Sequence, residues 1–156
     1  MNVLFVCTGN TCRSPIAEAL LRRALASGGA DDVTVGSAGA AASGGAPASE
    51  GAYLVGLERS VDLSGHRARL LTRELVAGAD LILTMSRSHR AQVEELGGGG
   101  KVHLLGEYAG RTGNAAEVSD PFGGELDDYR VAFDELERLV ESVRPRLASG
   151  RARDQR

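Results

Sequence analysis

Short apolar runs alternate with amphipathic stretches in a regular order along the chain. Val3-Leu4-Phe5-Val6 is a continuous β-favouring run, which is typical of a central parallel strand covered on both faces. Similar apolar runs predict three further strands, at residues 33–35, 80–85 and 102–105. Because strands alternate with predicted helices, the sequence predicts an α/β fold: a four-stranded parallel sheet with helices on both faces.

The helices are marked by apolar spacing and by residues that start or stop a helix. Ser14 can cap the first helix, Pro15 suits its first turn, and the pair of glycines that begins at Gly28 ends it. We expect Pro145 to end or kink the last helix. Further helices are predicted at about 47–57, after the cap Thr72, between Ser86 and the glycines 97–100, and from Leu126 onward.

The remaining segments lack such a pattern. The small-residue stretch "GSAGAAASGGAPAS", residues 36–49, predicts a loop, and an irregular segment leads to "SDPFGG", residues 119–124. The polar end "SGRARDQR" predicts a frayed tail. We therefore expect one domain over residues 1–149 and a polar C-terminal tail over residues 150–156.

Composition narrows the choice of partners. The chain has 156 residues, 42% of them hydrophobic, and 18 Lys and Arg stand against 21 Asp and Glu, which does not suggest a nucleic-acid-binding protein. No apolar run approaches the roughly 20 residues that a membrane span needs, and the short run after Met1 follows no basic segment. We expect a cytoplasmic protein with neither nucleic acid nor membrane as a partner.

The two cysteines, Cys7 and Cys12, both lie in the opening stretch. This is not a disulfide framework, and the C-x4-C spacing lacks the second ligand pair that a zinc site would need. In a reducing compartment such cysteines are expected to be reactive, not structural.

The stretch "CTGNTCRS", residues 7–14, joins the first strand to the first helix. In a parallel sheet such a loop lies where ligands bind, and it presents backbone N–H groups to an anion at the helix N-terminus. A Walker loop would need a Gly-Lys-Ser/Thr ending, and a dinucleotide fingerprint would need three spaced glycines, whereas only Gly9 is present. What remains is the pattern C-x5-R-S.

This pattern suits phosphoryl transfer to sulfur. A thiol at a helix N-terminus, beside N–H donors and Arg13, ionises far more easily than a free cysteine, so we expect Cys7 to be a thiolate at neutral pH. The same donors fit the oxygens of a phosphoryl group, and a guanidinium can bind two of them. A thiolate below a bound phosphoryl group is the geometry of an in-line transfer.

The stretch "FVCTGNTCRSPIAEALL" resembles the signature of the low-molecular-weight protein tyrosine phosphatase family. The resemblance continues in order through "SAG", "DLSGHRARLLT", "DLILTMSRSHR" and "DPFGG", and so covers most of the chain. It implies the Rossmann-like fold of phosphotyrosine protein phosphatase I, phosphorylated proteins as substrates, and phosphate or another oxyanion in the loop.

The resemblance also implies a role for each site residue. Cys7 is expected to form a phosphocysteine, Arg13 to clamp the phosphate, and Ser14 to steady the thiolate and ease its departure. Asp120 is expected to protonate the leaving group and then to activate water. The loop residues expected to bind substrate are Thr8, Gly9, Asn10, Thr11, Cys12 and Ser14; the residues expected to support the loop by hydrogen bonds are Asn10, Ser37 and His66.

Thr11 departs from the pattern of tyrosine-specific members, which commonly carry a larger aliphatic residue there. "CTGNTCRS" resembles instead a bacterial subgroup of protein arginine phosphatases. A small hydroxyl side chain suits a planar, polar guanidinium better than an aromatic ring. Phe122-Gly123 points the same way, because tyrosine-specific relatives often carry tyrosines there, and Asp120 could pair with the guanidinium while it delivers a proton.

Several of these residues have plainer interpretations. Cys7 could be an inert buried thiol, and Asp120 could be a turn former before its proline. Cys12 either fills space or forms, as in relatives, a reversible disulfide with the nucleophile. His66 is either an exposed loop residue or a support of the loop, and the remaining histidines are most simply a surface residue, His89, and a strand residue, His103.

We therefore predict a cysteine-dependent phosphatase that hydrolyses phosphoarginine in proteins through a phosphocysteine. It needs no metal or cofactor, since Arg13, the loop amides and the helix dipole stabilise the transition state. The nearest alternative is a phosphotyrosine phosphatase with the same residues. An arsenate reductase would need cysteines outside the loop, and the chain has none. A non-catalytic redox or anion-sensing module would have no use for Asp120 as a proton donor.

Overall fold

The computed structural model describes residues 1–28 and 32–154. Four parallel strands form one sheet in the order β2-β1-β3-β4, which confirms the predicted fold class. The strands are β1 (Asn2–Cys7), β2 (Thr34–Gly39), β3 (Leu81–Thr84) and β4 (Val102–Leu104). The helices are α1 (Arg13–Gly28), α2 (Glu50–Glu58), α3 (Arg73–Gly78), α4 (Arg87–Glu95), α5 (Leu105–Tyr108), the short 3-10 helix η1 (Gly113–Ala116) and α6 (Leu126–Asp154).

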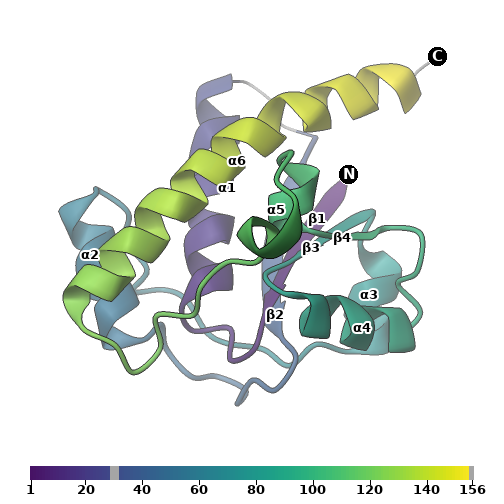
Figure 1. Ribbon diagram of the computed structural model, residues 1–156. Coiled ribbons are helices and arrows are strands. Elements are labelled where there is room, and N and C mark those ends of the chain that lie inside the picture. Colours follow the sequence, from purple (N-terminus) through teal and green to yellow (C-terminus); the bar gives the residue numbers. More distant parts are fainter. Residues whose placement is uncertain (29–31, 155–156) are drawn as a thin grey trace.

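Helices cover both faces of the sheet (Figure 1). Val3 and Phe5 of β1 pack in the same core cluster as buried residues of α1, α2 and α6. Leu4 and Val6 point to the other face, into a second cluster that includes residues of α3 and α4. Both faces of β1 are therefore buried, which explains its uninterrupted apolar run.

Strand β2 is longer than the sequence predicted. We expected residues 36–49 to form a loop, but β2 continues through "GSAG" to Gly39, which pairs with Cys7. Glycine, alanine and serine have little preference for strands, so pairing with β1 decides the conformation here. A Cβ atom on Gly39 would lie 2.6 Å from the carbonyl oxygen of Thr8 and 2.8 Å from the backbone nitrogen of Asn10. Only glycine lets β2 approach the loop between β1 and α1 so closely.

Two predictions about helix ends are wrong. Helix α1 begins at Arg13, and Ser14 lies inside its first turn, where its hydroxyl bonds other side chains. Helix α6 does not end at Pro145 but continues through it, because Val143 and Leu147 on either side of it are fully buried in the core. A kink at Pro145 stays a prediction. The helix also passes residue 150, so its end does not mark the expected boundary between domain and tail, which stays a prediction.

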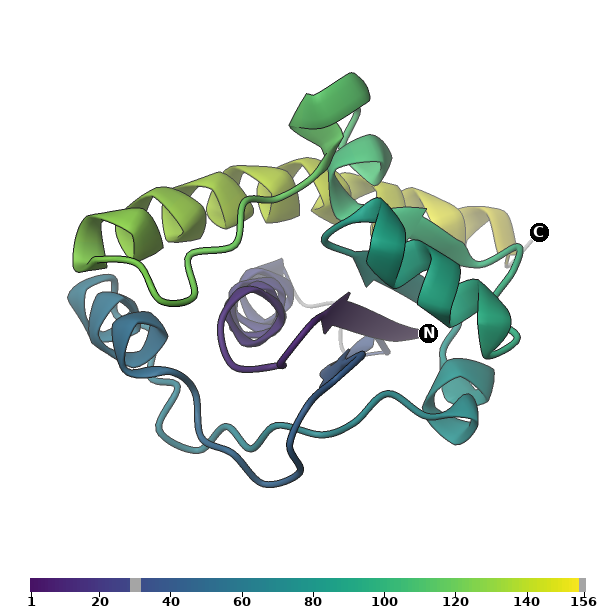
Figure 2. The ribbon, with the colours of Figure 1, turned by 60° about the horizontal axis from the view of Figure 1, so that its bottom comes forward.

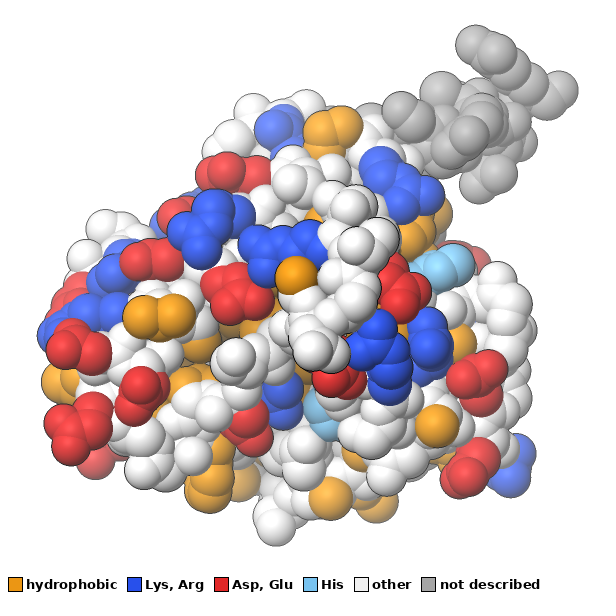
Figure 3. Space-filling model, in the orientation of Figure 1, with side chains coloured by type: hydrophobic (Ala, Val, Ile, Leu, Met, Phe, Trp, Pro, Cys, Tyr) orange, Lys and Arg blue, Asp and Glu red, His pale blue; other side chains and the backbone are white. Residues whose placement is uncertain are grey.

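The other predicted helices are present. Thr72 and Ser86 cap α3 and α4 as expected, by accepting hydrogen bonds from the backbone N–H groups of Leu75 and His89. The segment before "SDPFGG", expected to be irregular, contains α5 and η1. Within the described part of the chain, no helix is both long and apolar enough to cross a bilayer. On the face shown in Figure 3, cationic and anionic side chains are interspersed.

Candidate active site

The loop between β1 and α1 lies at the carboxyl end of the sheet. Strand β1 has β2 on one side and β3 on the other, so a crevice opens at the end of β1, where open α/β sheets bind ligands. Figure 2 shows this loop between the segment that precedes α6 and the segment that follows β2. Residues distant in the sequence thus surround residues 8–12.

Cys7 is the last residue of β1 and lies at the N-terminus of α1. Its Sγ atom is 2.9 Å from the hydroxyl of Ser14, and the side chain is buried. The partial positive charge of a helix N-terminus favours an anion, and a hydroxyl can donate to a thiolate. Both cysteines are free thiols. The structure therefore places the Cys7 thiol beside the hydroxyl of Ser14, at the positive end of α1.

The carbonyl groups of the loop are bonded to residues outside it. The carbonyls of Cys7 and Thr8 accept hydrogen bonds from the N–H groups of Ala40 and Ala41, both at 2.9 Å, and that of Thr11 accepts from Ser49. In a trans peptide the N–H group points opposite to the carbonyl. The N–H groups of the next residues, Thr8, Gly9 and Cys12, therefore point away from Ala40, Ala41 and Ser49. They can donate hydrogen bonds to an anion.

Asn10 holds the loop together from inside. It is fully buried with φ of 56°, a left-handed conformation that asparagine tolerates better than most residues. Its Nδ2 donates to the hydroxyls of Ser14 (2.8 Å) and Ser37 (2.9 Å), and its Oδ1 accepts from the N–H of Arg69 (3.0 Å). Nε2 of His66 lies 2.6 Å from the Asn10 carbonyl oxygen. These contacts fix the loop.

Arg13 connects the loop to the segment that carries Asp120. Its Nη1 donates to the carbonyl of Val118 at 2.9 Å, and its Nη2 lies 3.5 Å from Oδ2 of Asp120. The guanidinium is buried, whereas the Asp120 side chain is 48% exposed. Oδ1 of Asp120 accepts from the N–H of Phe122 at 3.0 Å, which leaves the other oxygen directed toward Arg13.

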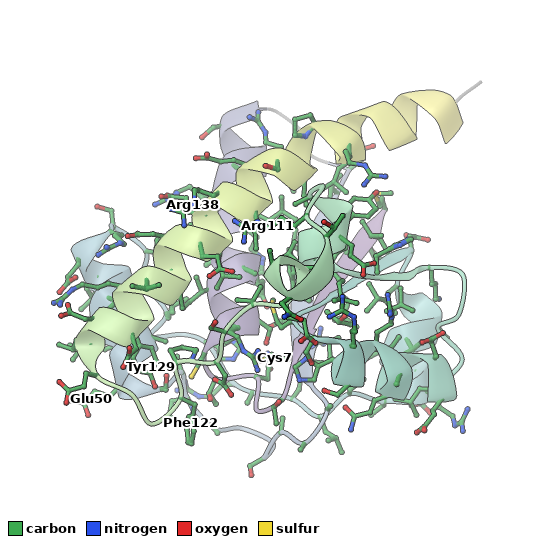
Figure 4. The ribbon with its side chains drawn as sticks, viewed as in Figure 1. Cys7, Glu50, Arg111, Phe122, Tyr129 and Arg138 are labelled. Carbon is green, nitrogen blue, oxygen red and sulfur yellow. The ribbon has the colours of Figure 1, made fainter. Side chains whose placement is uncertain are left out.

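These groups line one small pocket of about 140 Å³. Phe122, 71% exposed, forms its outer wall. In Figure 4, Cys7 lies in the interior and Phe122 projects from the loop before α6. A larger cavity of about 550 Å³ is lined by Ser37 and His66, but the thiol and the carboxylate meet in the smaller one. The residues of the small pocket are Cys7, Thr8, Gly9, Thr11, Cys12, Arg13, Asp120 and Phe122.

Comparison with known proteins identifies the family. The model of the family described as "Low molecular weight phosphotyrosine protein phosphatase" matches residues 2–152. The chain belongs to this family. It is 40% identical to the "Protein-arginine-phosphatase" of Bacillus subtilis (strain 168) over 97% of this chain and 99% of that protein. It is 37% identical to the "Low molecular weight protein-tyrosine-phosphatase PtpB" of Staphylococcus haemolyticus, over 92% of this chain and 98% of that protein.

Solved structures agree with this assignment. A mutant of the YwlE arginine phosphatase "with phosphorylated active site serine" superposes with a TM-score of 0.88, at 40% identity over 95% of this chain and 96% of that one. The resemblance noted in the sequence and the expected Rossmann-like fold are thus confirmed, and so is the prediction that the protein is a phosphatase.

The structure brings the predicted site residues of this phosphatase together in two groups. Cys7, Arg13 and Asp120, with most of the loop, line the pocket. Asn10, Ser14, Ser37 and His66 form the hydrogen-bonded support beneath it.

Cys12 lies against two hydroxyl groups. Its Sγ is 3.0 Å from Oγ of Ser49 and 3.9 Å from the hydroxyl of Tyr129. Burial raises the pKa of Tyr129, which therefore stays protonated at neutral pH. Tyr129 is part of the core, as its spacing predicted. A disulfide between Cys7 and Cys12 stays a prediction.

Sequence reasoning missed three contributors to the site. Glu18 accepts a hydrogen bond of 2.5 Å from the hydroxyl of Ser37 in addition to its ion pair with Arg22, and Arg69 bonds the Ser37 carbonyl. His89, interpreted as a surface residue, is buried and lies 2.8 Å from Oγ1 of Thr8. Its place in the first turn after β3, at the carboxyl edge of the sheet, is the signal that could have indicated it.

Proposed function

We propose that this phosphatase hydrolyses phosphoarginine in proteins by way of a phosphocysteine intermediate. The observation that carries the proposal is the pocket in which the Cys7 thiol, Arg13 and Asp120 meet beside the small, partly exposed side chain of Thr11. Phosphorylated proteins are thus the proposed substrates, and the cytoplasm is the proposed location.

In the first step the loop N–H groups and Arg13 hold the phosphoryl oxygens, and Cys7 attacks the phosphorus atom in line with the leaving group. A P–S bond forms while the bond from phosphorus to the guanidinium nitrogen breaks, and Asp120 gives its proton to that nitrogen. The buried guanidinium and the helix N-terminus stabilise the charge on the equatorial oxygens.

In the second step water attacks the phosphocysteine. Asp120, now ionised, accepts a proton from the water, the P–S bond breaks, and Cys7 leaves as a thiolate. The hydroxyl of Ser14, 2.9 Å from the sulfur, can donate to the thiolate and so ease its departure. Inorganic phosphate is released, and Asp120 is again protonated for the next cycle.

Three features support arginine as the phosphorylated residue. Thr11 leaves room and a hydroxyl beside the scissile bond, where an aliphatic residue would pack on a phenol ring. Asp120, whose side chain is half exposed, can protonate the leaving nitrogen as a carboxylic acid and then pair with the departing guanidinium as a carboxylate. Relatives named as protein arginine phosphatases, from Bacillus subtilis and Geobacillus stearothermophilus, cover more than nine-tenths of the chain.

The experiment compares turnover on a phosphoarginine protein with turnover on a matched phosphotyrosine peptide. Cys7→Ser serves as the blank, and Thr11→Ile tests the selector. We expect the parent enzyme to prefer phosphoarginine, and Thr11→Ile to lower kcat/KM for phosphoarginine by about 10–100-fold relative to phosphotyrosine. Thr34→Ile is the matched control. Thr34 begins β2, whereas the loop packs against Gly39 at the other end of the strand. This change should leave the preference for phosphoarginine over phosphotyrosine unchanged.

The second candidate function is the hydrolysis of phosphotyrosine. Although Phe122 stands where tyrosine-specific relatives often carry tyrosine, its exposed ring at the pocket wall is still aromatic and can stack on a phenol ring, which favours this function. Several relatives are named as tyrosine phosphatases. Preference of the parent enzyme for phosphotyrosine would select this function and reject Thr11 as the determinant of arginine specificity.

A further inference from the structure

His89 connects the start of α4 to the residue that follows the nucleophile. Its side chain is buried, with 4% exposed, and both ring nitrogens have hydroxyl partners. Nε2 lies 2.8 Å from Oγ1 of Thr8, and Nδ1 lies 3.0 Å from Oγ of Ser86. Ser86 is in turn the N-cap of α4, where its Oγ accepts from the N–H of His89. The ring is therefore held at a fixed place.

The contact between His89 and Thr8 holds the loop from a different side than the bonds made by residues after β2. Ala41, His66 and Arg69, which bond the loop, all follow β2 along the chain. His89 comes from α4, which follows β3, on the other side of β1. Thr8 itself is exposed, so its side chain would rotate freely without a partner. Its carbonyl is held from the β2 side and its hydroxyl from the β3 side.

We propose that His89 is a positioning residue: by bonding the hydroxyl of Thr8 it fixes the first peptide groups after Cys7, and with them phosphate binding and the aim of the thiolate. The proposal rests on the phosphate-loop chemistry proposed above, but not on which phosphorylated amino acid is the substrate. His89 lies outside the residues that line the pocket, so it acts through Thr8 and not on the phosphoryl group.

The ring acts through hydrogen bonds and not through charge. Burial and the neighbouring Arg13 lower the pKa of His89 to about 4, against the opposing effect of Asp120 and Glu117. The imidazole is therefore neutral at neutral pH. A neutral ring bonds a hydroxyl on either side without adding a second cation beside Arg13, so a neutral amide of similar reach should replace it.

The test uses four variants of the full chain: His89→Leu removes the bond, His89→Gln keeps a polar atom near the position of Nε2, Thr8→Val removes the partner, and the fourth combines His89→Leu with Thr8→Val. Four quantities are measured: the dissociation constant of inorganic phosphate by calorimetry, kcat and KM with a small aryl phosphate, and the melting temperature. His103→Leu is the matched control, because His103 is an exposed histidine on β4.

We expect His89→Leu to weaken phosphate binding and to lower kcat/KM by about tenfold each, the effect of one buried hydrogen bond. Thr8→Val should do the same, and the double variant should be no worse than either single one, because both remove the same contact. His89→Gln should stay within about threefold of the parent. The control should match the parent.

Two results would overturn the proposal. The first is a His89→Leu variant that melts at a lower temperature but keeps the parent's phosphate affinity and kcat. The second is full additivity of His89→Leu and Thr8→Val, which would mean that His89 does not act through Thr8. If His89→Leu does not fold, the same measurements on His89→Gln and Thr8→Val test the proposal: Thr8→Val with the parent's phosphate affinity and kcat/KM would overturn it. Failure of the unaltered protein to bind phosphate would instead contradict the proposed function.

Discussion

The pocket has two parts that differ in construction. The loop floor, made of Asn10, Ser14, Ser37 and His66, is rich in hydrogen bonds, and all of it but His66 is fully buried. The pocket mouth, made of Thr11, Asp120 and Phe122, is open: Asp120 is 48% exposed and Phe122 71%. In the proposed mechanism the floor supports the loop that binds the phosphoryl group, whereas the mouth faces the leaving group. Changes in the floor should therefore cost stability and phosphate binding together, and changes in the mouth should alter turnover or selectivity alone.

The largest effect is expected at the mouth, from Asp120→Asn. An amide can neither protonate the leaving group nor activate water, so kcat should fall by about 10²–10⁴-fold. Because Asp120 is half exposed, the melting temperature should stay close to that of the parent. Steady-state kinetics and thermal unfolding check the two halves of this prediction.

Asp127→Asn is the matched control, since Asp127 is an exposed carboxylate whose ion pair with Arg130 lies on α6. Unchanged turnover in Asp120→Asn would contradict the mechanism, because a group other than Asp120 would then have to protonate the leaving group and activate water.

Asn10→Ala tests the floor. It removes three side-chain hydrogen bonds from a buried site and places alanine in a left-handed conformation, so the free energy of unfolding should fall by about 3 kcal/mol. Phosphate affinity should fall with it. Urea unfolding measures the first and calorimetry the second. Asn114→Ala, at an exposed asparagine of η1, is the control. An Asn10→Ala variant that keeps its stability but loses phosphate affinity would contradict the expectation that the floor determines both.

The pH dependence of stability tests the support behind the floor. The pKa of folded His89 is about 4, below the ordinary value of 6.5, so between these values the unfolded chain binds a proton that the folded chain does not. The stability that this provides is present above pH 6.5 and is lost as the pH falls toward 4. Between pH 7 and pH 4.5 the free energy of unfolding of His89→Gln should therefore fall by about 2 kcal/mol less than that of the parent, as measured by urea unfolding. Parallel curves would contradict the neutral buried ring.

Phe122→Ala should have the smallest effect. The exposed ring contributes contact with a substrate but little to the fold, so KM for a protein substrate should rise about threefold to tenfold with an unchanged melting temperature. The rise should be greater for a phosphotyrosine peptide than for a phosphoarginine protein, because a phenol ring stacks on it. Leu57→Ala, at an exposed leucine of α2, is the control. An equal rise in KM for both substrates would mean that Phe122 does not distinguish the phenol leaving group from the guanidinium.

The sequence predicted those parts of the fold whose local pattern and tertiary environment agree. The apolar run Val3-Leu4-Phe5-Val6 predicts a strand covered on both faces, and the structure buries it on both. The end of β2 could not be predicted, because Ser37-Ala38-Gly39 is extended only through its pairing with β1. The passage of α6 through Pro145 has the same cause, since core packing on both sides outweighs a missing hydrogen bond.

The site divides in the same way. The loop from Cys7 to Ser14 is contiguous, so its chemistry can be read from residue types and spacing. Asp120 was found through its motif and not through any local signal. The place of His89, in the first turn after β3, can be read from the sequence, but its burial cannot, because that depends on a contact with Thr8 that no neighbouring residue indicates.

The hydrogen bonds of the loop have a consequence for folding. They join residues far apart along the chain: 59 positions separate Asn10 from Arg69, and 81 separate Thr8 from His89. Contacts of such long range form late, because the entropy of closing the chain must be overcome first. A fragment ending at residue 28 would contain the entire C-x5-R-S motif and still lack a working site. The return of activity during refolding should therefore mark the completion of the whole fold, and not the formation of the strand and helix that carry the motif.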